Sequence, residues 1–243
     1  MSLTNMPLSE IATEIPAAIS IFEQFEIDLC VWGDKPLGEA CAELRLSTEQ
    51  VREKVEALSA SEGGACDSES LSPTRLIQRI VRVHHRRIRQ DLPALARMAV
   101  RLEGRHSVCN KPNASLARSI HALHANLLSH IEKEEQILFP FIAAIDDEGG
   151  VLYHPGRACF PSLRKPIAAM MQDHTTANKI MDELRDRTDN FVVPAEACST
   201  ERALYGGLRR FEDDLRDHIH LEDNVLFPRA ITIESDLRKR RQA

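Results

Sequence analysis

The sequence contains no run of about 18 apolar residues, so we expect no segment to span a membrane. Its N-terminus, MSLTNMPLSEIATEIP, carries acids but no basic stretch, and we therefore expect no secretory signal and a cytoplasmic protein. Clustered basic residues are also scarce. The net charge of −6 argues against nucleic acid as a partner, because neutralising phosphates needs grouped lysines and arginines.

The alternation of apolar and polar residues that is typical of strands is missing, and long helical patterns take its place. We therefore predict an all-α fold: a four-helix bundle preceded by a small helical N-terminal domain. The four patterns cover 73–102, 114–145, 162–188 and 200–231. Pro93 lies inside the first pattern and predicts a kink or a break, since proline costs roughly 3 kcal/mol in a regular helix interior.

The first third of the chain has no histidine and reads as several short helices. The stretch SASEGGACDSESLSP, at 59–73, is rich in serine, glycine and acids, as linkers are. We predict a cysteine-containing domain over 1–60, a linker over 61–73 and the bundle over 74–243. The six cysteines are scattered rather than packed into a short chain, so reduced thiols are expected.

One stretch occurs twice. HIEKEEQILFP, at 130–140, returns as HIHLEDNVLFP at 218–228. Each copy places a histidine four residues before a glutamate, so on a helix the two side chains point the same way. Apolar neighbours put each pair beside or inside the core, where an ionised carboxylate is costly unless it is paired or binds a metal.

Each copy also has a histidine upstream at a matching distance. His85 precedes His130 by 45 residues, and His174 precedes His218 by 44. Four imidazoles and two carboxylates suit iron, manganese or zinc rather than calcium or magnesium. They fit two ions better than one, because six protein ligands would saturate a single octahedral ion. The predicted metal ligands are His85, His130, Glu134, His174, His218 and Glu222.

His84 is the alternative to His85. The two lie about 100° apart on a regular helix, so we expect only one to face the core, and the matching distances favour His85. Of the remaining histidines, His106 could orient or gate the site, and His124 could contact a ligand or lie on the surface. We expect His220 to be exposed. Glu135 is predicted to lie on the solvent-exposed side of its helix.

The proportion of histidine to glutamate separates this site from the ferritin type, which uses four Glu and two His. Neutral imidazoles would leave a ferric pair with excess positive charge. That charge favours an oxo bridge between two non-haem irons, or small added ligands such as dioxygen, nitric oxide or peroxide.

These motifs carry a resemblance to a known family. Residues 74–243 resemble the haemerythrin-like di-iron proteins, and the whole chain resembles the bacterial iron–sulfur cluster repair family. The matching stretches are DLCVWGDKPLGEAC, HRRIRQDLPAL, LHANLLSHIEKEEQILFP, QDH, VVPAEACST and DHIHLEDNVLFPRA. The resemblance implies the same six iron ligands, with Glu134 and Glu222 bridging the irons, and places His106 on the histidine that the family has between the first two helices.

The chain departs from the family in two places. The family has a Cys-Cys-Gly-Gly-Lys motif, whereas here Val31 and Trp32 follow Cys30, so the double cysteine is absent. Cys41 could still pair with Cys30, which leaves a thiol role open for both. An insertion of about a dozen residues around 149–166 includes Cys159.

The resemblance implies a di-iron protein that helps to repair iron–sulfur clusters damaged by nitrosative or oxidative stress, by donating iron or by handling nitric oxide. Its partners would be damaged iron–sulfur proteins and nitric oxide or dioxygen, without nucleic acid or membrane, and a homodimer is consistent with the family. The alternative is a nitric oxide or dioxygen binding or sensing protein without repair activity. A third reading is an enzyme that reduces nitric oxide or peroxide.

Overall fold

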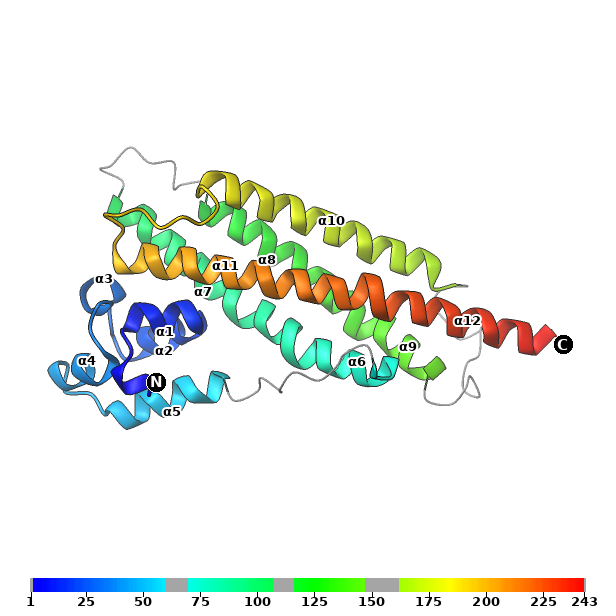
Figure 1. Cartoon of the computed structure of the whole chain (residues 1–243), viewed down its shortest axis with the longest axis horizontal. Helices are drawn as coiled ribbons and strands as arrows, with labels where there is room; N and C mark the ends of the chain where they lie inside the picture. Colours follow the sequence, from blue (N-terminus) through cyan, green and yellow to red (C-terminus); the bar gives the residue numbers. More distant parts are fainter. Residues whose placement is uncertain (1, 60–69, 107–115, 147–161, 243) are drawn as a thin grey trace. The chain divides into compact units, whose positions relative to one another are not determined.

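The structure, a computed structural model, describes residues 2–59, 70–106, 116–146 and 162–242 (Figure 1). Regular secondary structure in these ranges is helical, which confirms the predicted all-α class. None of the helices in the described ranges combines the length and the hydrophobicity needed to cross a bilayer.

The N-terminal part forms six short helical elements, in agreement with the sequence. Asp28 caps α3 by accepting from the backbone N–H of Cys30 at 2.9 Å. Ser47 accepts from the N–H of Gln50 at 3.3 Å, which caps the start of α5. The elements are η1 (Leu3–Asn5), α1 (Leu8–Glu14), α2 (Ala18–Gln24), α3 (Leu29–Trp32), α4 (Leu37–Glu43) and α5 (Thr48–Ser59).

The four long helical patterns are confirmed, although the fourth continues beyond its predicted end at 231 to Gln242. Three of them contain one turn of π-helix. Pro93 does not break its helix: α7 continues through it, and the irregular turn lies earlier, at 81–85. The elements are α6 (Pro73–Ile80), η3 (Val81–His85), α7 (Arg86–His106), α8 (Leu116–Lys133), η5 (Glu134–Leu138), α9 (Phe139–Asp146), α10 (Arg164–Arg187), α11 (Ser199–His220), η6 (Leu221–Leu226) and α12 (Phe227–Gln242).

Residue contacts divide the described chain into two compact units. The first takes its residues from 1–62, 87–124 and 180–213, and the second from 63–86, 125–179 and 214–243. The predicted domain division at 61–73 stays a prediction, because residues 60–69 lie outside the described ranges.

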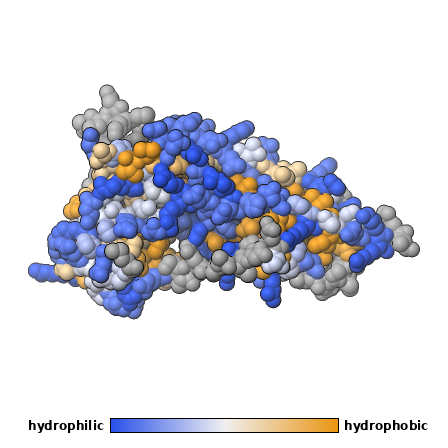
Figure 2. Space-filling view, in the orientation of Figure 1, coloured by the Kyte–Doolittle hydropathy of each residue, from blue (hydrophilic) through white to orange (hydrophobic). Residues whose placement is uncertain are grey.

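The second unit has an apolar core to which all four long helical patterns contribute. Its buried members include Leu76, Ile80, Leu138, Phe139, Ile142, Leu163, Ile167, Leu226 and Phe227. Two acidic side chains cap the N-termini of helices: Asp146 accepts from the N–H of Thr74 at 3.0 Å, and Glu234 accepts from the N–H of Leu163 at 3.3 Å. Hydrophilic side chains cover most of the face of α10 and α11 that Figure 2 shows.

In the first unit, the short helices pack closely on α11. A Cβ placed on Gly206 would lie 2.4 Å from Cγ2 of Thr13 in α1. Ion pairs also join the short helices to the long ones: Glu14 of α1 pairs with Arg210 of α11 at 2.7 Å, and Glu23 of α2 pairs with Arg101 of α7 at 2.9 Å. Glycine at 206 is therefore required by the closeness of the two helices.

This packing predicts opposite effects at two helical glycines. Gly206→Ala should destabilise the protein by about 1–3 kcal/mol, because Thr13 is branched at Cβ and cannot swing aside. Gly104→Ala meets nothing within 4 Å and should stabilise α7 by about 0.5–1 kcal/mol. Urea unfolding of both variants measures the difference, and equal effects at the two positions would contradict the packing.

Candidate metal centre

Two of the π-turns lie in the repeated stretches and begin at or beside the predicted ligand glutamates. In each, a phenylalanine N–H donates to the carbonyl five residues earlier: Phe139 to Glu134, and Phe227 to Glu222. A proline follows each phenylalanine. Proline cannot donate, and its ring crowds the carbonyl four residues before it, so a wider turn accommodates it. Single π-turns of this kind are frequent at functional sites.

The structure brings the six predicted ligands together inside the second unit. Five of them are fully buried, and His174 is only 2% exposed. They come from η3, α8, η5, α10, α11 and η6, so each long helical pattern contributes at least one.

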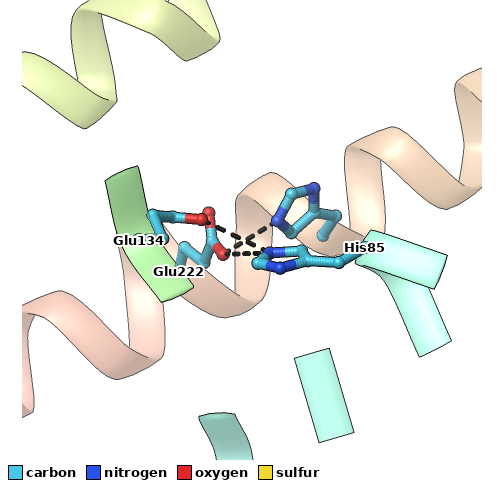
Figure 3. Close-up of side chains that lie close together, drawn as sticks. His85, Glu134 and Glu222 are labelled. Atoms are coloured by element: carbon cyan, nitrogen blue, oxygen red, sulfur yellow. Dashed lines mark hydrogen bonds and ion pairs between the residues drawn. The ribbon is translucent and has the colours of Figure 1, made fainter. Parts of the chain in front are cut away.

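The six residues form two overlapping groups, in each of which the potential ligand atoms lie within 4.8 Å of one another. The first group joins His85 and His218 to the two glutamates. Figure 3 shows His85 beside Glu134 and Glu222. His85 Nε2 lies 3.3 Å from Glu134 Oε2 and 3.6 Å from Glu222 Oε1. His218 Nε2 lies 2.8 Å from Glu222 Oε1.

The second group joins His130 and His174 to the same two glutamates. His130 Nε2 lies 3.2 Å from Glu134 Oε2, and His174 Nε2 lies 3.0 Å from Glu222 Oε2. The Nε2 atoms of the two histidines are 3.1 Å apart. Glu134 and Glu222 belong to both groups: Glu222 turns Oε1 toward the first group and Oε2 toward the second, and Glu134 Oε2 lies near one histidine of each.

Unsatisfied buried atoms show that this arrangement fits a cation. Among the residues that the structure describes, His85 Nε2, both carboxylate oxygens of Glu134 and Oε2 of Glu222 are buried and have no partner with hydrogen-bond geometry. A buried carboxylate without a donor is costly, and a coordinated cation removes that cost. Imidazole and carboxylate ligands suit iron, manganese or zinc.

Two further acids contact the cluster from outside. Glu135 Oε1 accepts a hydrogen bond from His85 Nδ1 at 2.7 Å, and Asp223 Oδ1 accepts from His174 Nδ1 at 3.0 Å. The prediction that Glu135 lies on the solvent-exposed side of its helix is therefore wrong, because its carboxylate turns toward His85. Each acid directly follows the ligand glutamate of its repeat. This shared position in the sequence could have indicated that both acids contact the cluster.

His84 and His85 are both buried, so the expectation that only one can face inward is also wrong. They lie in a π-turn, where successive residues are separated by a smaller angle than in a regular helix. His85 reaches the cluster. His84 Nδ1 donates to Asp214 at 3.0 Å, and its ring stacks on His218 with centroids 5.6 Å apart.

The glutamates dominate the electrostatics of the site. Burial lowers the pKa of a histidine, but the hydrogen bond to Glu135 and the nearby carboxylates of Glu134 and Glu222 outweigh it and raise the pKa of His85 to about 10. Burial also lowers the pKa of His130, but Glu134 and Glu222 outweigh this effect and raise it to about 10. Burial prevails at His218, whose pKa is lowered.

These shifts predict that the metal-free protein loses stability between about pH 7 and 9. His85 and His130 have pKa values raised from 6.5 to about 10, so the folded state holds more protons than the unfolded state in that range. Their stabilising contribution is complete below pH 6.5 and is lost as the pH rises through about 10. Bound metal replaces these protons, so the loaded protein should show little of this slope. Denaturant unfolding of the metal-free and the loaded protein at about pH 7 and 9 checks this prediction. A free energy of unfolding of the metal-free protein that rises with pH would contradict it.

The other predicted residues lie elsewhere. His124 is half-buried, and burial and then the charge of His121 lower its pKa. His220 is exposed, as expected. His106 ends α7, and its side chain lies outside the described residues, as do Cys159 and residues 149–161 of the proposed insertion.

No disulfide joins Cys30 to Cys41, so the structure does not show the pairing suggested from the sequence. Cys30 Sγ lies 2.8 Å from Thr200 Oγ1 and lines a cavity of about 340 Å³ in the first unit. Cys41 is fully buried, and that burial raises the pKa of its thiol. A raised pKa makes a thiol less reactive, so Cys30 is the better candidate for thiol chemistry.

Comparison with known proteins agrees with this geometry. The Hemerythrin HHE cation binding domain family matches residues 76–230, and a domain of unknown function (DUF542, ScdA_N) matches residues 4–59. The chain is 34% identical over 236 residues to proteins named iron-sulfur cluster repair protein YtfE from Citrobacter koseri and Escherichia coli O157:H7. Each alignment covers 96% of this chain and 100% of the relative. The chain therefore belongs to the hemerythrin-like iron–sulfur cluster repair family.

Proposed function

We propose that the six clustered residues bind two non-haem iron ions, joined by an oxo bridge in the ferric form. Glu134 and Glu222 would bridge the ions, His85 and His218 would complete one position, and the remaining two histidines the other. The observation that supports this is the membership of both glutamates in both buried groups. Four neutral imidazoles and two carboxylates leave a ferric pair positively charged, which favours a bridging oxygen.

We infer that this centre serves the repair of iron–sulfur clusters damaged by nitrosative or oxidative stress, in the cytoplasm. The names of relatives that align over their full length support this activity. The protein would donate iron to a damaged cluster protein or remove nitric oxide from it.

One observation favours a second function, the binding of nitric oxide or dioxygen without repair. All six side chains are at most 2% exposed, so a diatomic molecule can reach the centre more readily than a protein ligand can. The same burial means that iron donation requires the site to open.

A repair assay separates the two functions. An iron–sulfur enzyme inactivated by nitric oxide is incubated with iron-loaded protein, with metal-free protein, or with free ferrous iron at the same concentration. Recovery that needs the loaded protein supports repair. Stoichiometric nitric oxide binding by the reduced protein, with no recovery beyond that from free iron, supports binding alone and contradicts repair.

A further inference from the structure

Glu135 and Asp223 contact the cluster from equivalent places in the two repeats. Glu135 accepts from His85 Nδ1 at 2.7 Å, and Asp223 accepts from His174 Nδ1 at 3.0 Å. The two histidines belong to different groups of the cluster. The repeat therefore builds one imidazole–carboxylate contact into each half of the site.

Each contact determines which imidazole nitrogen faces the centre. A carboxylate accepts only, so Nδ1 carries the proton, and in the neutral imidazole that binds metal Nε2 carries the lone pair. In both residues Nε2 is directed inward: it lies 3.3 Å from Glu134 in His85 and 3.0 Å from Glu222 in His174. A carboxylate behind an imidazole that binds metal also raises its basicity.

The other two histidines differ. Nδ1 of His130 and Nδ1 of His218 are buried without a hydrogen-bond partner in the described residues. Asp173 Oδ2 stands 3.8 Å from the first of these, beyond hydrogen-bond distance. Each group thus pairs one supported imidazole with one unsupported imidazole.

We propose that Glu135 and Asp223 are positioning residues, one for each metal ion, which orient His85 and His174 and strengthen their bonds to metal. This role rests on the proposed two-iron centre. Both carboxylates retain some exposure, 27% for Glu135 and 19% for Asp223, so they keep part of their hydration while holding the buried rings. Loss of such a partner typically weakens metal binding about 10–100-fold.

The test uses the full-length, iron-loaded protein. Glu135→Ala and Asp223→Ala remove the contacts, whereas Glu135→Gln and Asp223→Asn keep an acceptor and remove the charge. Matched controls are Glu132→Gln in α8 and Asp217→Asn in α11, both exposed. Measurements are the rate of iron transfer to a chelator, the reduction potential of the centre and the melting temperature of the metal-free protein.

We expect both alanine variants to lose iron about 10–100-fold faster than the parent and the controls. The Gln and Asn variants should raise the reduction potential, because a neutral acceptor stabilises the ferric state less than a carboxylate does. Metal-free melting temperatures should fall only modestly, because each carboxylate also stabilises the protonated form of its histidine. Restoring a carboxylate with Asp223→Glu should bring the potential back toward that of the parent.

The outcomes distinguish a failure of the proposed two-iron centre from a failure of the role proposed for Glu135 and Asp223. A parent protein that binds no iron would overturn the proposed centre itself. A parent with two irons, beside variants with unchanged release and potential, would overturn only the role of Glu135 and Asp223. Variants whose metal-free form melts far below the parent, with a potential like that of the parent, would show a purely structural role and also overturn it.

Discussion

Replacing Glu134 and Glu222 together by glutamine should leave the protein without bound iron. Both carboxylates belong to both groups, so one double substitution weakens both metal positions. Changing a residue that merely supports a ligand costs about 10–100-fold in affinity, so losing two ligands should cost more than about 100-fold. Glutamine keeps the size of the side chain and removes two buried negative charges, so the helices should still form.

The matched control for this variant is Glu132→Gln combined with Asp217→Asn. It removes the same number of charges from exposed positions of α8 and α11. Iron content is measured after anaerobic loading, and far-UV circular dichroism reports the fold. If Glu134→Gln, Glu222→Gln retains both irons, the assignment of the ligands is wrong.

Removing both histidines of one group should abolish one metal position and keep the other. In His85→Leu, His218→Leu the first group has only its glutamates, whereas the second group is intact. Leucine is close to histidine in volume and cannot bind metal, so little space is left empty. We expect about one tightly held iron per chain, and the same for His130→Leu, His174→Leu, since each ion needs its own pair of imidazoles.

A crossed variant provides the control for this grouping. His85→Leu, His130→Leu takes one imidazole from each group, so both ions should be held weakly and no tight single iron should remain. Titration with ferrous iron distinguishes a stoichiometric single site from two weak ones. Identical titrations for the grouped and crossed variants would contradict the division into two groups.

The site was largely predictable because its signal is duplicated. A single His-x-x-x-Glu on a helix is usually a surface pair, but the second copy at 218–228 and the matched upstream histidines indicated one cluster. The structure places all six residues together and buried, as the spacing predicts for neighbouring helices.

The local errors share one cause, the assumption of regular helix geometry. A turn of π-helix at 81–85 buries both His84 and His85, and another at 134–138 contains Glu135, whose carboxylate turns toward His85. The predicted helical patterns ran through the proline that follows each repeated Leu-Phe pair, as the helices do, but they did not indicate the widened turn before it. Pattern rules that assume 3.6 residues per turn cannot foresee these turns.

Long-range contacts in the first unit could not be predicted from the sequence either. Nothing local to Gly206 indicates that Thr13 packs against it, and nothing near Cys30 indicates Thr200 as its neighbour. Such contacts depend on how separate helices approach one another, which periodicity within one helix does not encode.

The central claim, that two irons share Glu134 and Glu222, is tested most directly by metal analysis combined with Mössbauer spectroscopy of the oxidised protein. A shared di-iron centre should give about two irons per chain and a diamagnetic ground state, because two ferric ions joined through bridging oxygens couple antiferromagnetically. One zinc per chain, or two ferric ions with no magnetic coupling, would contradict it.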